Sequence, residues 1–386
     1  MQDLDLAGAT LRYAGVQDVE HRADGSVGLS RLPAWTKAQI VDPTLQLLVG
    51  MTSGARLELV TDSRTIELEV GLTLLRMGDA ATIPAAFDLV VDGALVDGCT
   101  SIDGTVIVVA PDRSVDFLPG PATATVRFEG LPAGEKHVEV WLPHAAAMVL
   151  HAVRLDDGAT AVAPPADTRV RWVHYGSSIS HCLEAERPTG VWPVVAARAA
   201  DVALASVAFG GQAQLDQFAA RTISALPADV ISLKVGINLV NADSMRERTF
   251  VPAVHGFLDT IRDGHPTTPI LLITPILCPA HEDAPGPTIS TPTRITSFPR
   301  PAELGLGALT IGRIRALLAD VVAARIAAGD AHLRLLDGRD LFGEDDLADL
   351  PDGLHPNAAG YVRMGERFTA WARHQDLWTL TPAERA

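Results

Sequence analysis

The chain has 386 residues, of which 47% are hydrophobic, and this is enough apolar material for two packed domains. Its formal net charge of −16 at pH 7 argues against binding nucleic acid or an anionic membrane through bulk electrostatics, so neither is an expected partner. The three cysteines, Cys99, Cys182 and Cys278, are too widely spaced for a disulfide framework or a Cys-x-x-Cys pair.

Two further features of the sequence bear on its location. The first residues, MQDLDLAGAT, have neither the basic nor the apolar region of a secretory signal. No apolar run reaches the length of about 18 residues that a membrane span requires. A cytoplasmic location is therefore the default expectation, although a chain trimmed of a secretory signal would look the same.

Up to about residue 160 the sequence is typical of short strands. RLELVTDSRTIELEVGLT (56–73) alternates apolar and polar residues with a period of two. FDLVVDGALVDG (87–98) predicts two strands around a turn at Gly93, and ATVRFEGLPAGEKHVEVWL (124–142) predicts a second hairpin of the same design. These patterns predict an antiparallel, jelly-roll-like β-sandwich over residues 1–160.

A segment rich in Ala, Pro, Asp and Gly at 156–169 predicts a linker. The hydrophobic pattern of the sequence changes after it. A second domain is expected over 168–386, where apolar runs alternate with helical stretches. The predicted strands are 170–175, 202–209, 229–235, 269–276 and 332–337. Their continuous apolar character predicts an α/β domain in which helices cover both faces of a parallel sheet.

The segments that follow these strands carry the candidate chemistry. Ligands of open α/β sheets bind beyond the carboxyl ends of the strands. The stretch YGSSISHC brings Ser178 after the first strand, Gly211 follows the second strand and Asn238 the third. Asp352 and His355 follow the fifth strand within DGLHPNAAGY. Together these residue types are the parts of a site for acyl transfer.

Each of these residues has a physical role in such a reaction. Ser178 needs a base within hydrogen-bond reach, and His355 can take its proton on Nε2. Asp352, three residues earlier, can hold the opposite ring nitrogen and stabilise the imidazolium. The oxyanion of the tetrahedral intermediate needs donors, which the N–H groups of Ser178 and Gly211 and the side-chain amide of Asn238 can supply.

The ordered set of motifs resembles the SGNH (GDSL-like) hydrolase superfamily over about residues 169–375. The resemblance assigns Ser178 as nucleophile, Gly211 and Asn238 to the oxyanion hole, and Asp352 and His355 to the remaining block. It implies a flavodoxin-like three-layer α/β/α domain with strand order 2-1-3-4-5 and no cofactor or metal. The family's usual Asp before the nucleophile is Ser177 here, which we expect to support the turn.

Each motif taken alone also has a purely structural interpretation. Gly-Ser-Ser and Asn238 are common in turns, and DGLHPNAAGY would also suit a helix that begins at Asp352 with Pro356 in its first turn. His181 and Trp192 either line a substrate pocket or pack in the core, and Cys182 is expected to be small and buried. A metal site would draw on His174, His181, His281 and Glu282, but their spacing matches no metal motif.

The sequence therefore predicts a serine esterase for short acyl esters, with O-acetyl groups on carbohydrate as the preferred substrate. The carbohydrate assignment rests on resemblance to esterases that carry a β-sandwich before the hydrolase domain. Trp35 and Trp141 are candidate sugar platforms, with burial in the core as the alternative. The Pro-rich segment 278–303 is either a lid beside the site or a surface excursion.

Three other functions stay open at this point. An acyltransferase would use the same triad with an alcohol in place of water. A non-catalytic carbohydrate-binding protein would keep the fold but not the turnover. A lipase would accept longer acyl chains, with 278–303 as the segment able to supply an interfacial lid.

Overall fold

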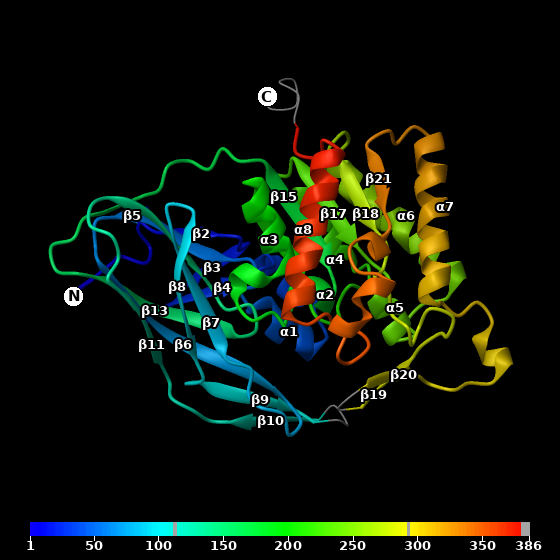
Figure 1. Ribbon diagram of the computed structural model, residues 1–386, viewed down its shortest axis with the longest axis horizontal. Coiled ribbons are helices and arrows are strands. Elements are labelled where there is room, and N and C mark those ends of the chain that lie inside the picture. Colours follow the sequence, from blue (N-terminus) through cyan, green and yellow to red (C-terminus); the bar gives the residue numbers. More distant parts are fainter. Residues whose placement is uncertain (111–113, 292–293, 380–386) are drawn as a thin grey trace. The chain divides into compact units, whose positions relative to one another are not determined.

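The computed structural model describes residues 1–110, 114–291 and 294–379, and the chain divides into two units (Figure 1). The first unit consists of Met1–Thr168 together with Glu186–Val191, and the second consists of Arg169–Ala185 and the chain from Trp192 onward. The sequence did not predict the short return of Glu186–Val191 to the first unit. The expected second domain ran to residue 386, and residues 380–386 lie outside the described part of the chain.

The first unit is built from two β-sheets. Its strands are β1 (Gln2–Asp3), β2 (Arg12–Ala14), β3 (Asp18–His21), β4 (Val27–Ser30), β5 (Arg56–Thr61), β6 (Thr65–Met77), β7 (Ala85–Val91), β8 (Ala94–Ser101), β9 (Thr105–Val109), β10 (Val115–Leu118), β11 (Ala124–Glu129), β12 (Lys136–Trp141), β13 (Ala147–Leu155) and β14 (Ala161–Val162). Its helical segments are η1 (Ala34–Ala38), α1 (Pro43–Val49) and, in the returning segment, η2 (Pro188–Gly190).

The two sheets have different strand orders. One runs β10-β9-β6-β13-β4-β3, with β1 added to β13 and β11 added to β6. The other runs β14-β5-β12-β7-β8, with β2 added to β5. The described pairs are antiparallel except that β6 and β9 run parallel, which the alternating sequence pattern did not predict.

Of the two predicted hairpins, one is present and the other is wrong. β7 and β8 pair around Asp92 and Gly93, whose φ values of 48° and 80° suit the tight turns that match strand twist. β11 and β12, in contrast, lie in different sheets, because β11 pairs with β6 while β12 pairs with β5 and β7. Alternation identifies a strand with one buried face, but it does not identify the strand's partner.

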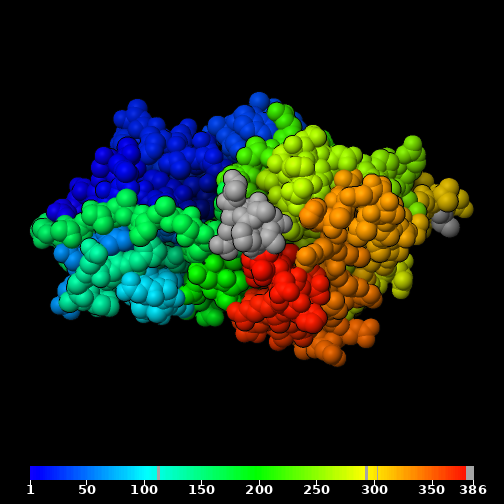
Figure 2. Space-filling view, turned by 90° about the horizontal axis from the view of Figure 1, so that it is seen from above, coloured from blue at the N-terminus to red at the C-terminus, as the bar shows by residue number. Residues whose placement is uncertain are grey.

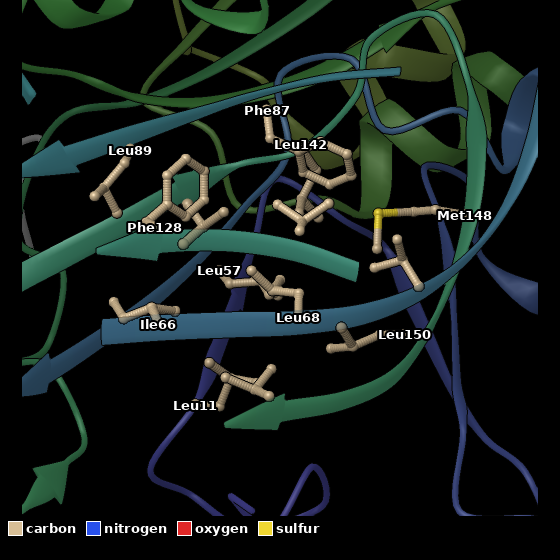
Figure 3. Close-up of a cluster of buried hydrophobic side chains, with 14 of the residues drawn as sticks. Leu11, Leu57, Ile66, Leu68, Phe87, Leu89, Phe128, Leu142, Met148 and Leu150 are labelled. Atoms are coloured by element: carbon tan, nitrogen blue, oxygen red, sulfur yellow. The ribbon is translucent and has the colours of Figure 1, made fainter. Parts of the chain in front are cut away.

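The core of the first unit lies between the inner faces of its sheets. Figure 3 shows apolar side chains from both sheets meeting there, and all of those labelled are buried. They are Leu11, Leu57, Ile66, Leu68, Phe87, Leu89, Phe128, Leu142, Met148 and Leu150. Interdigitated inner faces are the packing expected of a β-sandwich.

The two candidate sugar platforms in this unit differ in exposure. Trp141 is only 2% exposed, its Nε1 donates to Glu139, and the guanidinium of Arg56 lies 4.8 Å from its ring centroid. Trp141 is therefore a core residue and not a surface for sugar stacking. Trp35 of η1 is 39% exposed, so of these two tryptophans it is the one whose ring is accessible to a sugar.

The second unit contains a parallel sheet of the predicted order. Its strands are β15 (Arg171–Gly176), β16 (Ala203–Ala208), β17 (Val230–Lys234), β18 (Ile270–Ile273) and β21 (Leu333–Leu336), with a separate hairpin of β19 (Thr288–Thr291) and β20 (Arg294–Ser297). The order β16-β15-β17-β18-β21 is the doubly wound 2-1-3-4-5 arrangement. The strands β15, β16 and β17 that precede the candidate residues Ser178, Gly211 and Asn238 are therefore neighbours.

Helices cover both faces of this sheet. They are α2 (Ser178–His181), α3 (Trp192–Ala200), α4 (Gln217–Ala225), α5 (Ile237–Asn241), α6 (Glu247–Gly264), α7 (Ile311–Ala327) and α8 (Ala358–His374), with η3 (Ala302–Gly305), η4 (Gly338–Asp340) and η5 (Glu344–Asp349) between them. Trp172 of β15 stacks on Phe368 of α8, whereas Tyr175 packs on Phe257 of α6. Trp172 and Tyr175, an odd number of positions apart on one strand, thus face different helix layers, which explains why the strand is apolar on both faces.

The last helix also holds the segment that leads to the Asp-x-x-His block. Arg363 and Arg367 of α8 both form ion pairs with Asp346 of η5, at 2.8 and 2.5 Å. In Figure 2 the surface of α8 (red) adjoins the orange surface of the preceding segment. Among the described residues, no helix is long and apolar enough to cross a membrane.

Candidate active site

The turn after β15 presents Ser178 and buries Ser177. Ser177 is fully buried, and its Oγ accepts a hydrogen bond of 3.3 Å from the N–H of Ile179 at the start of α2. A Cβ on Gly176 would lie 2.5 Å from Oγ of Ser180, so only glycine lets the strand turn this tightly into the helix. Ser177 therefore caps the helix, and Ser178 is the serine that reaches the candidate site.

Ser178, His355 and Asp352 form a continuous relay. Oγ of Ser178 lies 2.9 Å from Nε2 of His355, although the two residues are 177 positions apart in the chain. Nδ1 of His355 lies 2.7 Å from Oδ2 of Asp352. When Nδ1–H donates to the carboxylate, Nε2 is left as the acceptor for the serine hydroxyl, which is the arrangement a general base requires.

Asp352 is oriented by its own turn. Its Oδ1 accepts from the N–H groups of Leu354 and His355 at 2.8 and 2.7 Å, so Oδ2 is left for the imidazole. Burial raises the pKa of this carboxyl, but the hydrogen bonds and charge of His355 outweigh burial and hold the pKa below its ordinary value. Asp352 does not cap α8, because Asn357 does so by accepting from Gly360 N–H.

Two opposing effects set the pKa of His355. Burial lowers it, whereas the negative charges of Glu184 and Asp352 and the hydrogen bond to Asp352 raise it, and the net result lies above the ordinary value of 6.5. Sequence reasoning missed Glu184. Nothing in its spacing connects it to His355, and its position six residues after Ser178 was the only available signal.

The expected oxyanion donors lie on segments that hydrogen bonds connect. The N–H of Ser178 is the first of α2, and the first N–H groups of a helix have no partner within it. His181 of α2 accepts from Gly210 N–H through Nδ1 at 3.3 Å, which ties the nucleophile helix to the loop of Gly211. Gly211 itself has a φ of 75°.

Asn238 is fixed by a third segment of the same neighbourhood. It is 2% exposed, and its Oδ1 accepts from Ala213 N–H at 2.9 Å. Because this bond uses the carbonyl oxygen of the amide, Nδ2 is the end that remains available as a donor. Nε2 of Gln214 adds a bond of 3.1 Å to the backbone oxygen of Asn238. The loop after β16 is therefore tied both to α2 and to α5.

The Pro-rich segment 278–303 borders the candidate site. The N–H of Ile295 in β20 donates to the backbone oxygen of Asp352 at 2.9 Å, so the β19–β20 hairpin contacts the turn that carries the carboxylate. Residues 292 and 293 of this segment lie outside the described part of the chain. Phe298, Leu304 and Leu306 in and after this segment are 52%, 63% and 87% exposed.

The histidines and the glutamate considered for a metal site have other partners. His281 binds the backbone oxygen of Ala284 through Nδ1 and Thr288 Oγ1 through Nε2. Glu282 forms an ion pair with Arg315. Nδ1 of His174 lies 2.7 Å from Ser232 Oγ in the core. Within the described residues, no group of three or more His, Cys, Asp or Glu side chains is placed to hold a metal ion.

Two further candidates from the sequence are core residues. Trp192 is fully buried, and its ring packs on Trp172, His174 and Phe368. Cys182 is also fully buried, and its thiol donates to the backbone oxygen of Ile179. Both side chains therefore pack in the core.

The chain is similar to known proteins in sequence and in fold. Residues 174–363 match the model of the GDSL-like lipase/acylhydrolase family. The fold is similar to the salicylyl-acyltransferase SsfX3 from a tetracycline biosynthetic pathway, with 27% identity, a TM-score of 0.80, and coverage of 98% of this chain and 99% of that one. A search of curated proteins finds no match.

Carbohydrate esterases share the fold at lower identity. A family two carbohydrate esterase from Cellvibrio japonicus is 13% identical with a TM-score of 0.58, and 98% of each chain is covered. An acetyl xylan esterase from the rumen bacterium Butyrivibrio proteoclasticus is 12% identical with a TM-score of 0.58, over 98% of this chain and 100% of that one. Residues 174–363 therefore form a domain of the GDSL-like lipase/acylhydrolase family, and through this domain the chain is a carboxylic ester hydrolase.

Proposed function

We propose that this enzyme cleaves esters of short carboxylic acids through an acyl-enzyme formed on Ser178. The observation that supports the proposal is the relay of 2.9 Å from Ser178 Oγ to His355 Nε2 and 2.7 Å from His355 Nδ1 to Asp352 Oδ2. A serine hydroxyl without such a base is a weak nucleophile. The relay supplies the base, the tautomer and the charge that the imidazolium needs.

The reaction follows from these positions in two halves. Oγ of Ser178 attacks the ester carbonyl while its proton passes to Nε2 of His355, and the carbonyl oxygen becomes an oxyanion. The N–H groups of Ser178 and Gly211 and Nδ2 of Asn238 are the proposed donors to that oxyanion. Collapse breaks the bond to the alcohol, which leaves with the proton from Nε2. Water, activated by the same nitrogen, then releases the acid and restores Ser178.

The proposed substrate is an acetyl ester, with a carbohydrate hydroxyl as its alcohol. The support is the layout of a β-sandwich unit before the hydrolase, which the chain shares in fold with the two carbohydrate esterases above. This support is an analogy of fold. The exposed apolar side chains in and after 278–303 are the feature that a preference for longer acyl chains would use.

Acyl transfer is the second candidate function. The chain covers 99% of the salicylyl-acyltransferase at 27% identity, so both units have a counterpart in an enzyme named for transfer. The same acyl-enzyme serves both outcomes, since an alcohol in place of water gives a new ester. Product analysis with and without added alcohols or sugars separates hydrolysis from transfer.

The test compares wild type, Ser178→Ala and Ser177→Ala on p-nitrophenyl acetate, butyrate and octanoate. We expect Ser178→Ala to lose nearly all activity. Ser177→Ala should keep a substantial part while losing about 1 kcal/mol of stability, because it removes a helix cap. Ser177→Ala is thus the matched control, one residue away with the same loss of a hydroxyl.

Each other outcome has a defined meaning. If Ser178→Ala is folded and as active as wild type, the proposed nucleophile is wrong. If the enzyme prefers octanoate to acetate, the proposed acetylesterase activity is wrong and the enzyme is a lipase. If wild type binds sugars but turns over no ester and transfers no acyl group, the protein is a carbohydrate-binding protein and the catalytic proposal fails.

A further inference from the structure

A second carboxylate faces the imidazole of His355. Oε1 of Glu184 lies 3.7 Å from Nδ1, the same nitrogen that lies 2.7 Å from Asp352 Oδ2. Glu184 follows α2, whereas His355 and Asp352 precede α8, so the contact joins distant parts of the second unit. The side chain of His355 is 20% exposed and that of Glu184 is 38% exposed.

The other oxygen of Glu184 is anchored. The hydroxyl of Tyr361, which is fully buried in α8, donates to Glu184 Oε2 at 2.8 Å. Burial and the charge of Glu184 raise the pKa of Tyr361 well above its ordinary value, so its hydroxyl stays protonated and remains a donor. One carboxylate oxygen is thus held by the phenol, and this leaves the other directed toward the imidazole.

The charge of this second carboxylate affects the protonation of His355. The charges that raise the pKa of His355 are those of Glu184 and Asp352, and both groups are acidic. Cys182, near Tyr361, is buried and neutral because burial raises its pKa. Asp352 already accepts the Nδ1 proton, so Glu184 interacts with the ring mainly through its charge. That interaction strengthens when the ring becomes an imidazolium in the reaction.

We propose that Glu184, held by Tyr361, is a positioning residue that stabilises the positively charged form of His355 during acyl transfer. The inference rests on the proposed role of His355 as general base. It assigns to the Glu184–Tyr361 pair the task of keeping a second negative charge beside a ring whose first carboxylate partner is Asp352.

The first test is the pH profile of kcat/KM on p-nitrophenyl acetate for wild type, Glu184→Gln and the control Glu366→Gln. In Glu184→Gln the acid limb should move to lower pH by roughly half to one unit, because an acidic neighbour that raised the pKa of His355 is gone. The plateau should fall about three- to tenfold, because the imidazolium loses stabilisation. Glu366 is an exposed residue of α8, and its neutralisation should leave both quantities unchanged.

A second variant tests the anchor. Tyr361→Phe keeps the buried ring and the charge of Glu184 but removes the hydroxyl that holds it. The acid limb should move in the same direction as in Glu184→Gln, by less. If the pH profile shifts in Glu184→Gln but is unchanged in Tyr361→Phe, Tyr361 does not hold Glu184 in place, and that part of the proposal is refuted. The part that assigns the effect to the charge of Glu184 would be retained.

The second measurement does not depend on ester turnover. The imidazole resonances of His355 are titrated by NMR in wild type and Glu184→Gln, with His355→Gln to assign them. A lower pKa in Glu184→Gln is expected, and an unchanged pKa overturns the proposal whatever the activity does. If wild type hydrolyses no ester, the proposed function fails, while the titration still decides whether Glu184 raises the pKa of His355.

Discussion

Asp352→Asn is a nearly isosteric change that should reverse the proton relay. In the native turn Oδ1 accepts from the N–H groups of Leu354 and His355, and Oδ2 accepts from His355 Nδ1. Asparagine has one oxygen, and the two backbone donors hold it in the Oδ1 position. The NH₂ group then takes the place of Oδ2 and faces Nδ1, which must become an acceptor.

The size of the effect follows from this reversal. An imidazole that accepts at Nδ1 carries its proton on Nε2, so the atom 2.9 Å from Ser178 Oγ can no longer take the serine proton. The wrong tautomer in a Ser-His-Asp site costs about 10⁴ in turnover. We therefore expect a loss of about 10³–10⁴ in kcat, which corresponds to about 4–5.5 kcal/mol of barrier.

Asp352→Ala supplies the comparison that isolates the tautomer effect. Alanine also removes the carboxylate but presents no NH₂ group to Nδ1, and Glu184 Oε1 lies 3.7 Å from that nitrogen. Asp352→Ala should therefore be more active than Asp352→Asn, although alanine is the larger deletion. The assay is kcat on p-nitrophenyl acetate at a pH on the plateau, with thermal unfolding to confirm that both variants are folded.

The outcome that refutes this reasoning is specific. If Asp352→Asn is folded and retains a tenth or more of wild-type kcat, the tautomer of His355 does not depend on Asp352 and the relay is misassigned. If Asp352→Asn and Asp352→Ala are equally impaired, the loss comes from the missing charge and the reversed donor contributes nothing measurable.

Three other changes test separate parts of the site. Asn238→Ala should lower kcat by about 10²–10³ with little change in KM, because it removes a proposed oxyanion donor, and steady-state kinetics measure both. The acid limb of kcat/KM should have its midpoint above pH 6.5, because the raised pKa of His355 keeps the ring protonated, and unable to accept a proton, to higher pH. Gly176→Ala should lower the free energy of unfolding by about 1–3 kcal/mol, measured by urea titration, because the added Cβ would lie 2.5 Å from Ser180 Oγ.

Local patterns in the sequence were sufficient to predict the parallel sheet. Runs such as VRWVHY are apolar on both faces, and only a strand between two helix layers buries Trp172 and Tyr175 on opposite sides. Short connections through helices then leave few possible strand orders. The candidate residues Ser178, Gly211 and Asn238 follow from the same logic, because each comes directly after a predicted strand.

Contacts between segments that are distant in the chain could not be predicted from the sequence. Alternation marked β11 and β12 as strands but did not show that they join different sheets. The return of Glu186–Val191 depends on Asp88, which accepts from the N–H and hydroxyl of Thr189 at 2.9 and 2.6 Å across 101 positions. Glu184 was missed for the same reason, since the Tyr361 that holds it is 177 positions away.

These distant contacts also explain how weak local motifs make a defined site. Gly-Ser-Ser, Gly-Gly and a lone Asn after a strand are ordinary turn sequences, and none fixes the orientation of a side chain. The orientation comes from bonds between the turns: His181 to Gly210, and Asn238 to Ala213. The first bond joins segments that follow the neighbouring strands β15 and β16, and the second joins segments that follow β16 and β17, the two strands that flank β15. The strand order β16-β15-β17 is therefore what makes both bonds possible. A substitution that breaks one of these bonds should therefore lower kcat even where the substituted residue does not contact the substrate. The reason is that oxyanion donors act only when they are held in place before the charge develops.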